Sequence, residues 1–78
     1  MTTRAQREAE AQHEREAEEA REAGVAYFQA YPDAMLAEAV REATGRYGMS
    51  AKHQWFAFYL AVIAARAQRN EYLKEGRA

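Results

Sequence analysis

Hydrophobic and polar positions divide the chain into a charged first third and an apolar remainder. Residues 1–24 are mostly Glu, Arg, Gln and Ala, whereas residues 55–65 (WFAFYLAVIAA) run without a single charge. The chain has one proline and four glycines, and β-branched residues are few, which favours helices over strands. We therefore predict a small all-α domain of three helices, with a charged, acidic helical arm at 1–24 and an apolar helical core at 25–78.

The first helix is predicted from its boundary residues. Thr3 suits the N-cap position, and Gln6 follows at the spacing of a capping box. We expect the helix to continue to about Ala23 and to end at Gly24, which is a plausible terminator. Residues 25–31 either extend this helix or form a short turn of their own. Alanines are the only apolar residues between Thr3 and Gly24, so this helix is expected to cover little of the core.

Two further helices follow. Pro32 suits the first position of a helix, with Asp33 in the first turn where the helix dipole favours a negative charge. This second helix is expected to run to about Thr44. Ser50 is a good N-cap for the third helix, which we expect to extend to about Lys74.

The third helix carries large apolar residues on more than one of its faces. On one face, apolar residues recur at i, i+4, i+7 and i+11 from Phe56 to Ala67. A second face is an alanine-rich strip of small side chains from Ala57 to Gln68. A helix that is apolar all round must be buried nearly all round, yet the second helix carries only one apolar stripe. One face is thus left for a partner, and we predict that the partner interface comprises Trp55, Phe58, Tyr59, Val62, Arg66, Arg69 and Leu73.

The length of the chain bears on what this partner is. A domain of 78 residues buries only about 60–65% of the surface that its unfolded form exposes, and the sequence contains no cysteine to form disulfides. Such a small domain is only marginally stable by itself, and without disulfides it can gain stability by forming an oligomer. Two-fold homodimers are the commonest soluble oligomers. We predict a homodimer through the third helix; a different protein as partner, or a compact monomer, are the alternatives.

Charge is unevenly distributed along the chain. The formal net charge is −1, composed of −3 over residues 1–24 and +2 over residues 25–78, so the total does not suggest a polyanion binder. Four glutamates at a spacing of four residues should form an acidic ridge on the first helix. The ridge is either a solvated charged surface or a surface that engages a basic partner, and it consists of Glu10, Glu14, Glu18 and Glu22.

No catalytic or metal motif is apparent. Ser50 is close in sequence to Lys52 and His53, which could form a Ser–Lys or Ser–His catalytic pair. However, Ser50 is explained as a helix cap, and no acidic residue is placed to orient such a pair. His13 and His53 lie forty residues apart in sequence and make a poor metal pair. We therefore expect a non-enzymatic protein without a cofactor.

A DNA-binding regulator is the alternative function. The second helix, a connector and the third helix are similar in order to a helix-turn-helix, and Gly48-Met49-Ser50 followed by Trp55 and Phe58 resembles the turn and recognition helix of TetR-type repressors. The chain departs from that pattern because its turn is longer and most of the third helix is too apolar for a major groove. Direct nucleic-acid binding is thus not the expectation; if it occurs, its contacts would be Arg46, Lys52, His53 and Gln54.

The remaining expectations concern location and role. The first twenty residues lack the apolar segment of a signal peptide, and residues 55–65 are too short for a bilayer, which needs roughly 20 apolar residues. We expect a cytoplasmic protein without a membrane partner. Its predicted role is to bind and block a larger protein or nucleoprotein complex as an inhibitor or adaptor, in the manner of small helical anti-defence proteins such as anti-CRISPR proteins.

Overall fold

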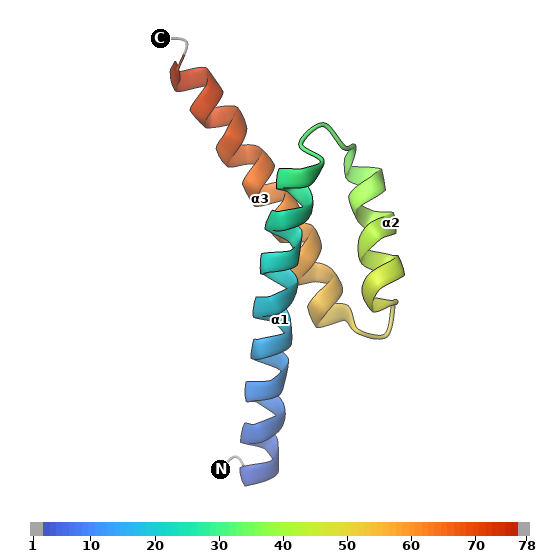
Figure 1. Ribbon diagram of the computed structural model, residues 1–78. Coiled ribbons are helices and arrows are strands. Elements are labelled where there is room, and N and C mark those ends of the chain that lie inside the picture. Colours follow the sequence, from blue (N-terminus) through green and yellow to red (C-terminus); the bar gives the residue numbers. More distant parts are fainter. Residues whose placement is uncertain (1–2, 77–78) are drawn as a thin grey trace.

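The protein, seen in a computed structural model that describes residues 3–76, is a set of three helices. α1 spans Arg4–Ala30, α2 spans Leu36–Tyr47 and α3 spans Lys52–Gly76. Figure 1 shows α1 and α3 running in the same general direction and crossing, with α2 returning alongside. α3 packs against both other helices, which confirms the all-α, three-helix prediction.

α1 begins as the sequence predicts and ends later. The Gln6 amide donates to Thr3 Oγ1 at 3.2 Å, and the Thr3 amide donates to Gln6 Oε1 at 3.0 Å, which completes the capping box. The helix does not stop at Gly24 but continues to Ala30. The expected end at Gly24 is therefore wrong, and of the two alternatives for residues 25–31 the structure has the extension of the first helix, up to Ala30.

The start of α2 also differs from the prediction. Pro32 is not the first residue of the helix but lies in a turn, in which the Ala34 amide donates to the Tyr31 carbonyl at 3.1 Å. Proline fits this second turn position as well as it fits a helix start. α2 begins at Leu36, and the Met35 carbonyl accepts the first bonds of the helix.

The connector between α2 and α3 depends on one glycine. Gly48 follows the last residue of α2 and has a φ of 71°, a left-handed conformation that glycine adopts without strain. Gly45, in contrast, lies inside α2. The first helical bonds of α3 go to the Ala51 carbonyl, so the predicted cap at Ser50 is one residue too early.

The core is small and consists mostly of alanine. Phe58, which has no exposed surface, is the one large side chain that is fully buried among residues 3–74. The rings of Tyr27 and Tyr47 lie 5.6 and 5.9 Å from the Phe58 ring, so residues from all three helices meet there. The buried hydrophobic residues are Ala20, Ala39, Ala43, Ala57, Phe58 and Val62.

α1 covers α3 by close approach rather than by large side chains. A Cβ at Gly24 would lie 2.5 Å from the Phe58 carbonyl oxygen and 3.0 Å from the Ala61 Cβ. The two backbones thus meet at a point that only glycine fits, while Ala17, Ala20 and Ala23 pack nearby. The expectation that an alanine-rich helix covers little is wrong because small residues allow the helices to come closer.

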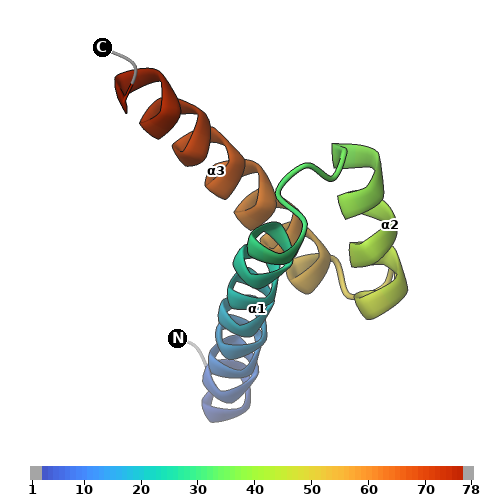
Figure 2. The same cartoon turned by 45° about the horizontal axis from the view of Figure 1, so that its top comes forward.

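The molecule is long and thin. Its principal extents are 53 × 27 × 16 Å and its radius of gyration is 15.2 Å, whereas a compact domain of this length has a radius of about 11.5 Å. The N-terminal end of α1 and the C-terminal end of α3 project from opposite ends of the molecule, as Figure 1 and the turned view in Figure 2 both show. A large part of α3 is therefore left uncovered.

Candidate functional site

The uncovered part of α3 carries a row of apolar side chains, here called the outer stripe and made of Phe56, Leu60, Ile63 and Ala67. Phe56 is 53% exposed and Leu60 is 58% exposed, Ala67 is exposed and Ile63 is half-buried. Phe56 and Leu60 each lie two residues from the buried Phe58, and residues two apart point to nearly opposite sides of a helix. The outer stripe therefore faces away from the chain's own core.

The residues predicted as a partner interface are divided between inside and outside. Phe58 and Val62 belong to the core, and Trp55 and Tyr59 pack against it half-buried. A partner docked on this conformation cannot reach the two core residues, so the predicted set does not form one exposed face. The exposed members of the set are Arg66, Arg69 and Leu73.

Trp55 is fixed by polar and aromatic contacts within the chain. Its Nε1 donates to Thr44 Oγ1 at 2.9 Å, which ties the start of α3 to the end of α2. Its ring lies 5.2 Å from that of Phe56, edge to face, and 5.4 Å from that of Tyr59. Trp55 thus joins the packed side of α3 to the outer stripe rather than standing free as a docking residue.

Arg69 contacts the loop that follows α1. Its guanidinium donates to the Pro32 carbonyl at 3.2 Å and lies 3.6 Å from the Asp33 carboxylate. Asp33 is almost fully exposed, so solvent weakens this ion pair. The contact nevertheless occupies one of the arginines predicted to face a partner.

Two of the four residues predicted to contact nucleic acid are engaged within the chain. Arg46 Nε donates to Glu42 Oε1 at 2.8 Å, and this bond raises the pKa of Arg46 above its usual value. The Arg46 guanidinium also lies 5.2 Å from the centre of the Phe58 ring, a cation–π geometry. His53 packs on α1, Gln54 is half-buried and Lys52 is exposed.

His53 belongs to a cluster that the sequence analysis did not anticipate. Its ring stacks on that of His13 with centroids 4.5 Å apart, and its Nε2 lies 3.4 Å from Glu16 Oε2. Forty residues separate the two histidines in sequence, so only the crossing of α1 and α3 brings them together. The one available signal was the helical spacing of His13, Ala17, Ala20 and Gly24 on one face of α1.

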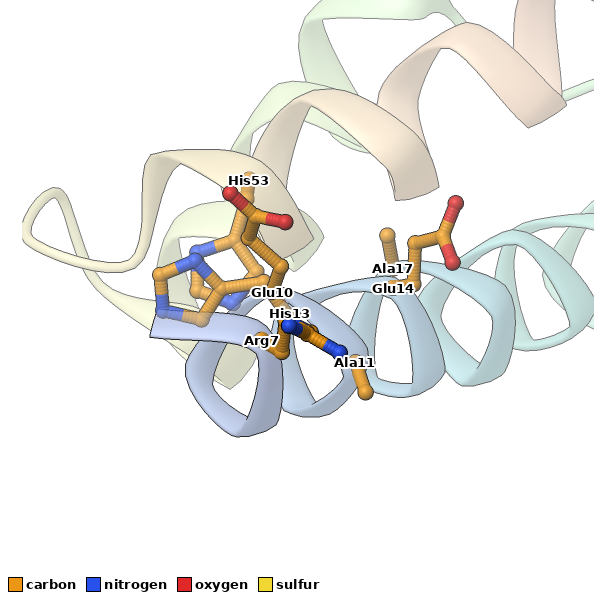
Figure 3. A pocket seen from close by; sticks show the side chains of 7 residues that line it. All are labelled: Arg7, Glu10, Ala11, His13, Glu14, Ala17 and His53. Carbon is orange, nitrogen blue, oxygen red and sulfur yellow. The ribbon is translucent and has the colours of Figure 1, made fainter. Parts of the chain in front are cut away.

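An open groove of about 630 Å³ lies beside the histidine pair. Figure 3 shows the two imidazole rings overlapping at one end of it. Among the side chains that the structure describes, those of residues 3–74, no three His, Cys, Asp or Glu residues form a group that could hold a metal ion. The groove is lined by Arg7, Glu10, Ala11, His13, Glu14, Ala17 and His53.

The predicted acidic ridge lies on the exposed surface of α1. All four glutamates are exposed, and the Glu18 carboxylate accepts a bond from Arg21 at 2.6 Å. Glu10 and Glu14 border the groove, whereas Glu22 lies farther along the helix. The ridge therefore remains available on a helix that does not carry the outer stripe.

Comparison with protein-family models, with curated proteins and with solved structures finds no significant match to this chain. None of the helices in residues 3–76 combines the length and the apolar character needed to cross a membrane.

Proposed function

We propose that the chain is a non-catalytic interaction module that works as a homodimer through the outer stripe of α3. The homodimer would act in the cytoplasm by occupying a surface on a larger protein or nucleoprotein complex, as an adaptor or inhibitor. The observation that carries the proposal is the exposure of Phe56 and Leu60 on a helix whose opposite side forms the core. Contiguous exposed apolar patches on small proteins mark interaction sites.

The exposed area supports the same proposal. The chain exposes 6126 Å² of surface, whereas a compact monomer of 8.9 kDa is expected to expose about 4,800 Å². The surplus, about 1,300 Å², exceeds the roughly 800 Å² that one partner contributes to a standard interface. This surplus belongs to the whole elongated molecule, and it includes the outer stripe of α3 as well as the polar, projecting half of α1.

The role toward a larger partner is supported by the part of the surface that such a dimer leaves free. The acidic ridge lies on α1 and outside the outer stripe, so its carboxylates stay accessible to a basic surface. Charge complementarity of this kind accelerates association and selects the partner. The absence of cysteine from the sequence is compatible with work in the cytoplasm.

The experiment that tests the proposal is solution mass by light scattering after size exclusion, over a range of concentrations. We expect a mass near twice the 8.9 kDa of the chain. Leu60→Lys should raise the dimer dissociation constant by at least about 100-fold, because two leucines, at roughly 1.5–3 kcal/mol each, lose their burial. Its helix content, measured by circular dichroism, should not change.

Val25→Lys is the matched control, because Val25 is also an exposed apolar residue but lies on α1. This variant should dimerise like the original chain. A native chain that stays at monomer mass at every concentration would reject the homodimer, and equal effects of the two lysines would show that the outer stripe is not the interface.

A further inference from the structure

We infer that the two copies of α3 pair in antiparallel orientation, with Phe56 of one copy packed against Ala67 of the other and Leu60 against Ile63. This inference rests on the proposed function and specifies the partner's position on the same stripe. The spacing, the side-chain sizes and the helix ends of α3 all favour this orientation.

The spacing of the outer stripe is that of a helix-pairing seam. Phe56, Leu60, Ile63 and Ala67 are separated by four, three and four residues, which is the repeat that two helices use when they pack side by side. The next two seam positions are polar, Asn70 and Lys74. The apolar seam is therefore limited to the twelve residues from Phe56 to Ala67, whose ends are about 16 Å apart at 1.5 Å per residue.

Reversing one copy gives a match of sizes that parallel pairing does not. In the antiparallel arrangement the largest side chain of the seam, Phe56, meets the smallest, Ala67, at both ends of the interface. Facing positions that alternate large and small fill space well. Parallel pairing would instead place Phe56 on Phe56, Ala67 on Ala67 and the charged Lys74 on Lys74, leaving crowding at one end and a gap at the other.

The residues that flank the seam favour the same orientation. Tyr59 and Arg66 lie on the same edge of the seam, one turn to either side of Ile63, and antiparallel pairing sets Arg66 of one copy beside Tyr59 of the other. Arg66 is exposed and Tyr59 is half-buried, so a cation–π contact can form twice in the dimer. Antiparallel helices also place opposite dipole ends side by side, which is favourable.

The neighbouring helices leave this side of α3 open. α1 approaches α3 at Phe58 and Ala61, and α2 approaches it through the bond between Thr44 and Trp55. Leu60 and Phe56 nevertheless remain more than half exposed, although the Phe56 ring touches that of Trp55. A second α3 can therefore reach the stripe without displacing α1 or α2.

Cysteine cross-linking tests the orientation directly, because the chain contains no cysteine of its own. Full-length Phe56→Cys and Ala67→Cys variants are prepared, checked for helix content and dimer mass, and oxidised alone and as an equal mixture. Disulfides need Cα atoms within about 7 Å. Antiparallel pairing brings positions 56 and 67 together but holds the two copies of position 67 about 16 Å apart along the helices.

We expect a disulfide-linked dimer in the mixture, with the 56–67 bridge confirmed by peptide mass spectrometry. Each variant alone should cross-link no more than Gln29→Cys, an exposed control on α1. Self-linking of Ala67→Cys at twice the chain mass would show parallel pairing and overturn the inference while the proposed function stands. Monomer mass for the native chain would overturn both, and a dimer with no cross-link above the control would place the interface elsewhere.

Discussion

The two sides of α3 are built from similar residues and have opposite surroundings. The inward side carries Phe58 and Val62, both buried against the other two helices. The outward side carries Phe56 and Leu60, both more than half exposed. Side-chain type does not separate these sides, since each has one phenylalanine and one aliphatic residue.

The difference is made by what the neighbouring helices present to α3. Gly24 lets the α1 backbone approach the Phe58 carbonyl, and Tyr27 and Tyr47 close over the Phe58 ring. Among residues 3–76, no comparable group covers the outer stripe. The side of α3 on which we propose an interface is thus the side that its own chain leaves exposed.

Truncation of Phe58, on the inward side of α3, should cause the largest loss of stability. We expect Phe58→Ala to lower the free energy of unfolding by about 3–5 kcal/mol, because it removes the one large buried side chain and leaves a cavity. Urea denaturation followed by circular dichroism measures the change. Phe56→Ala is the matched outward variant and should cost less than about 1 kcal/mol. Both are made in the Leu60→Lys background so that dimerisation does not contribute to stability.

Equal losses for Phe58→Ala and Phe56→Ala would contradict the division of α3 into a packed and an open side. A loss at Phe56 that appears only without Leu60→Lys would instead sharpen the division, since the exposed ring would then matter only in the dimer.

A methyl group at Gly24 should cause the next largest effect. Gly24→Ala would place Cβ 2.5 Å from the Phe58 carbonyl oxygen, so α1 and α3 must separate, at a cost of about 1–3 kcal/mol. Gly45→Ala is the control, because a Cβ there meets nothing within 4 Å and Gly45 lies inside α2. That substitution should stabilise the chain by about 0.5–1 kcal/mol. Thermal unfolding of both variants checks the signs, and stabilisation by both would refute the tight crossing.

Tyr27 gives the smallest effect, through pH. Burial beside Phe58 raises the pKa of Tyr27, and the charges of Glu38 and Glu42 add to the shift. The folded state therefore holds the phenolic proton more tightly than the unfolded state, whose pKa is about 10. This stability is complete below about pH 10 and is lost as pH rises through the folded pKa. The unfolding free energy of Tyr27→Phe should thus fall less steeply above about pH 10.

Tyr72→Phe serves as the comparison, because Tyr72 is 75% exposed and lies near the C-terminal end of α3, away from the Phe58 core. Its profile of unfolding free energy against pH should follow that of the original chain. If Tyr27→Phe also follows the original profile, burial does not raise the pKa of Tyr27 in the folded chain.

Much of the fold follows from patterns that are local in sequence. The capping box at Thr3 and Gln6 depends on residues three apart, and the helical character of each segment depends on composition. Pro32 misleads because the same residue suits a helix start and a turn, and the choice depends on the bond between Ala34 and Tyr31. Gly24 misleads in the same way, since only its contact with Phe58 shows why a glycine stands inside a helix.

The candidate site was less accessible to sequence analysis. The repeat from Phe56 to Ala67 is visible in the sequence, yet the packed side of α3, which carries Trp55 and Phe58, has an equally strong apolar pattern. Which face is covered depends on how α1 and α2 dock, and that depends on contacts between residues far apart in sequence, eleven residues for Thr44 and Trp55 and 34 residues for Gly24 and Phe58. The pair of His13 and His53 depends on the same crossing.

The close fit of α1 on α3 also bears on synthesis of the chain by the ribosome. About 34 residues separate Gly24 from Phe58, so α1 waits about 2–7 s for its partner at 5–20 residues per second. A first helix with large apolar side chains along its contact face would expose them to aggregation during that interval. Alanine and glycine dominate that face up to Gly24, so this part of the nascent helix exposes little apolar surface that could aggregate before α3 emerges.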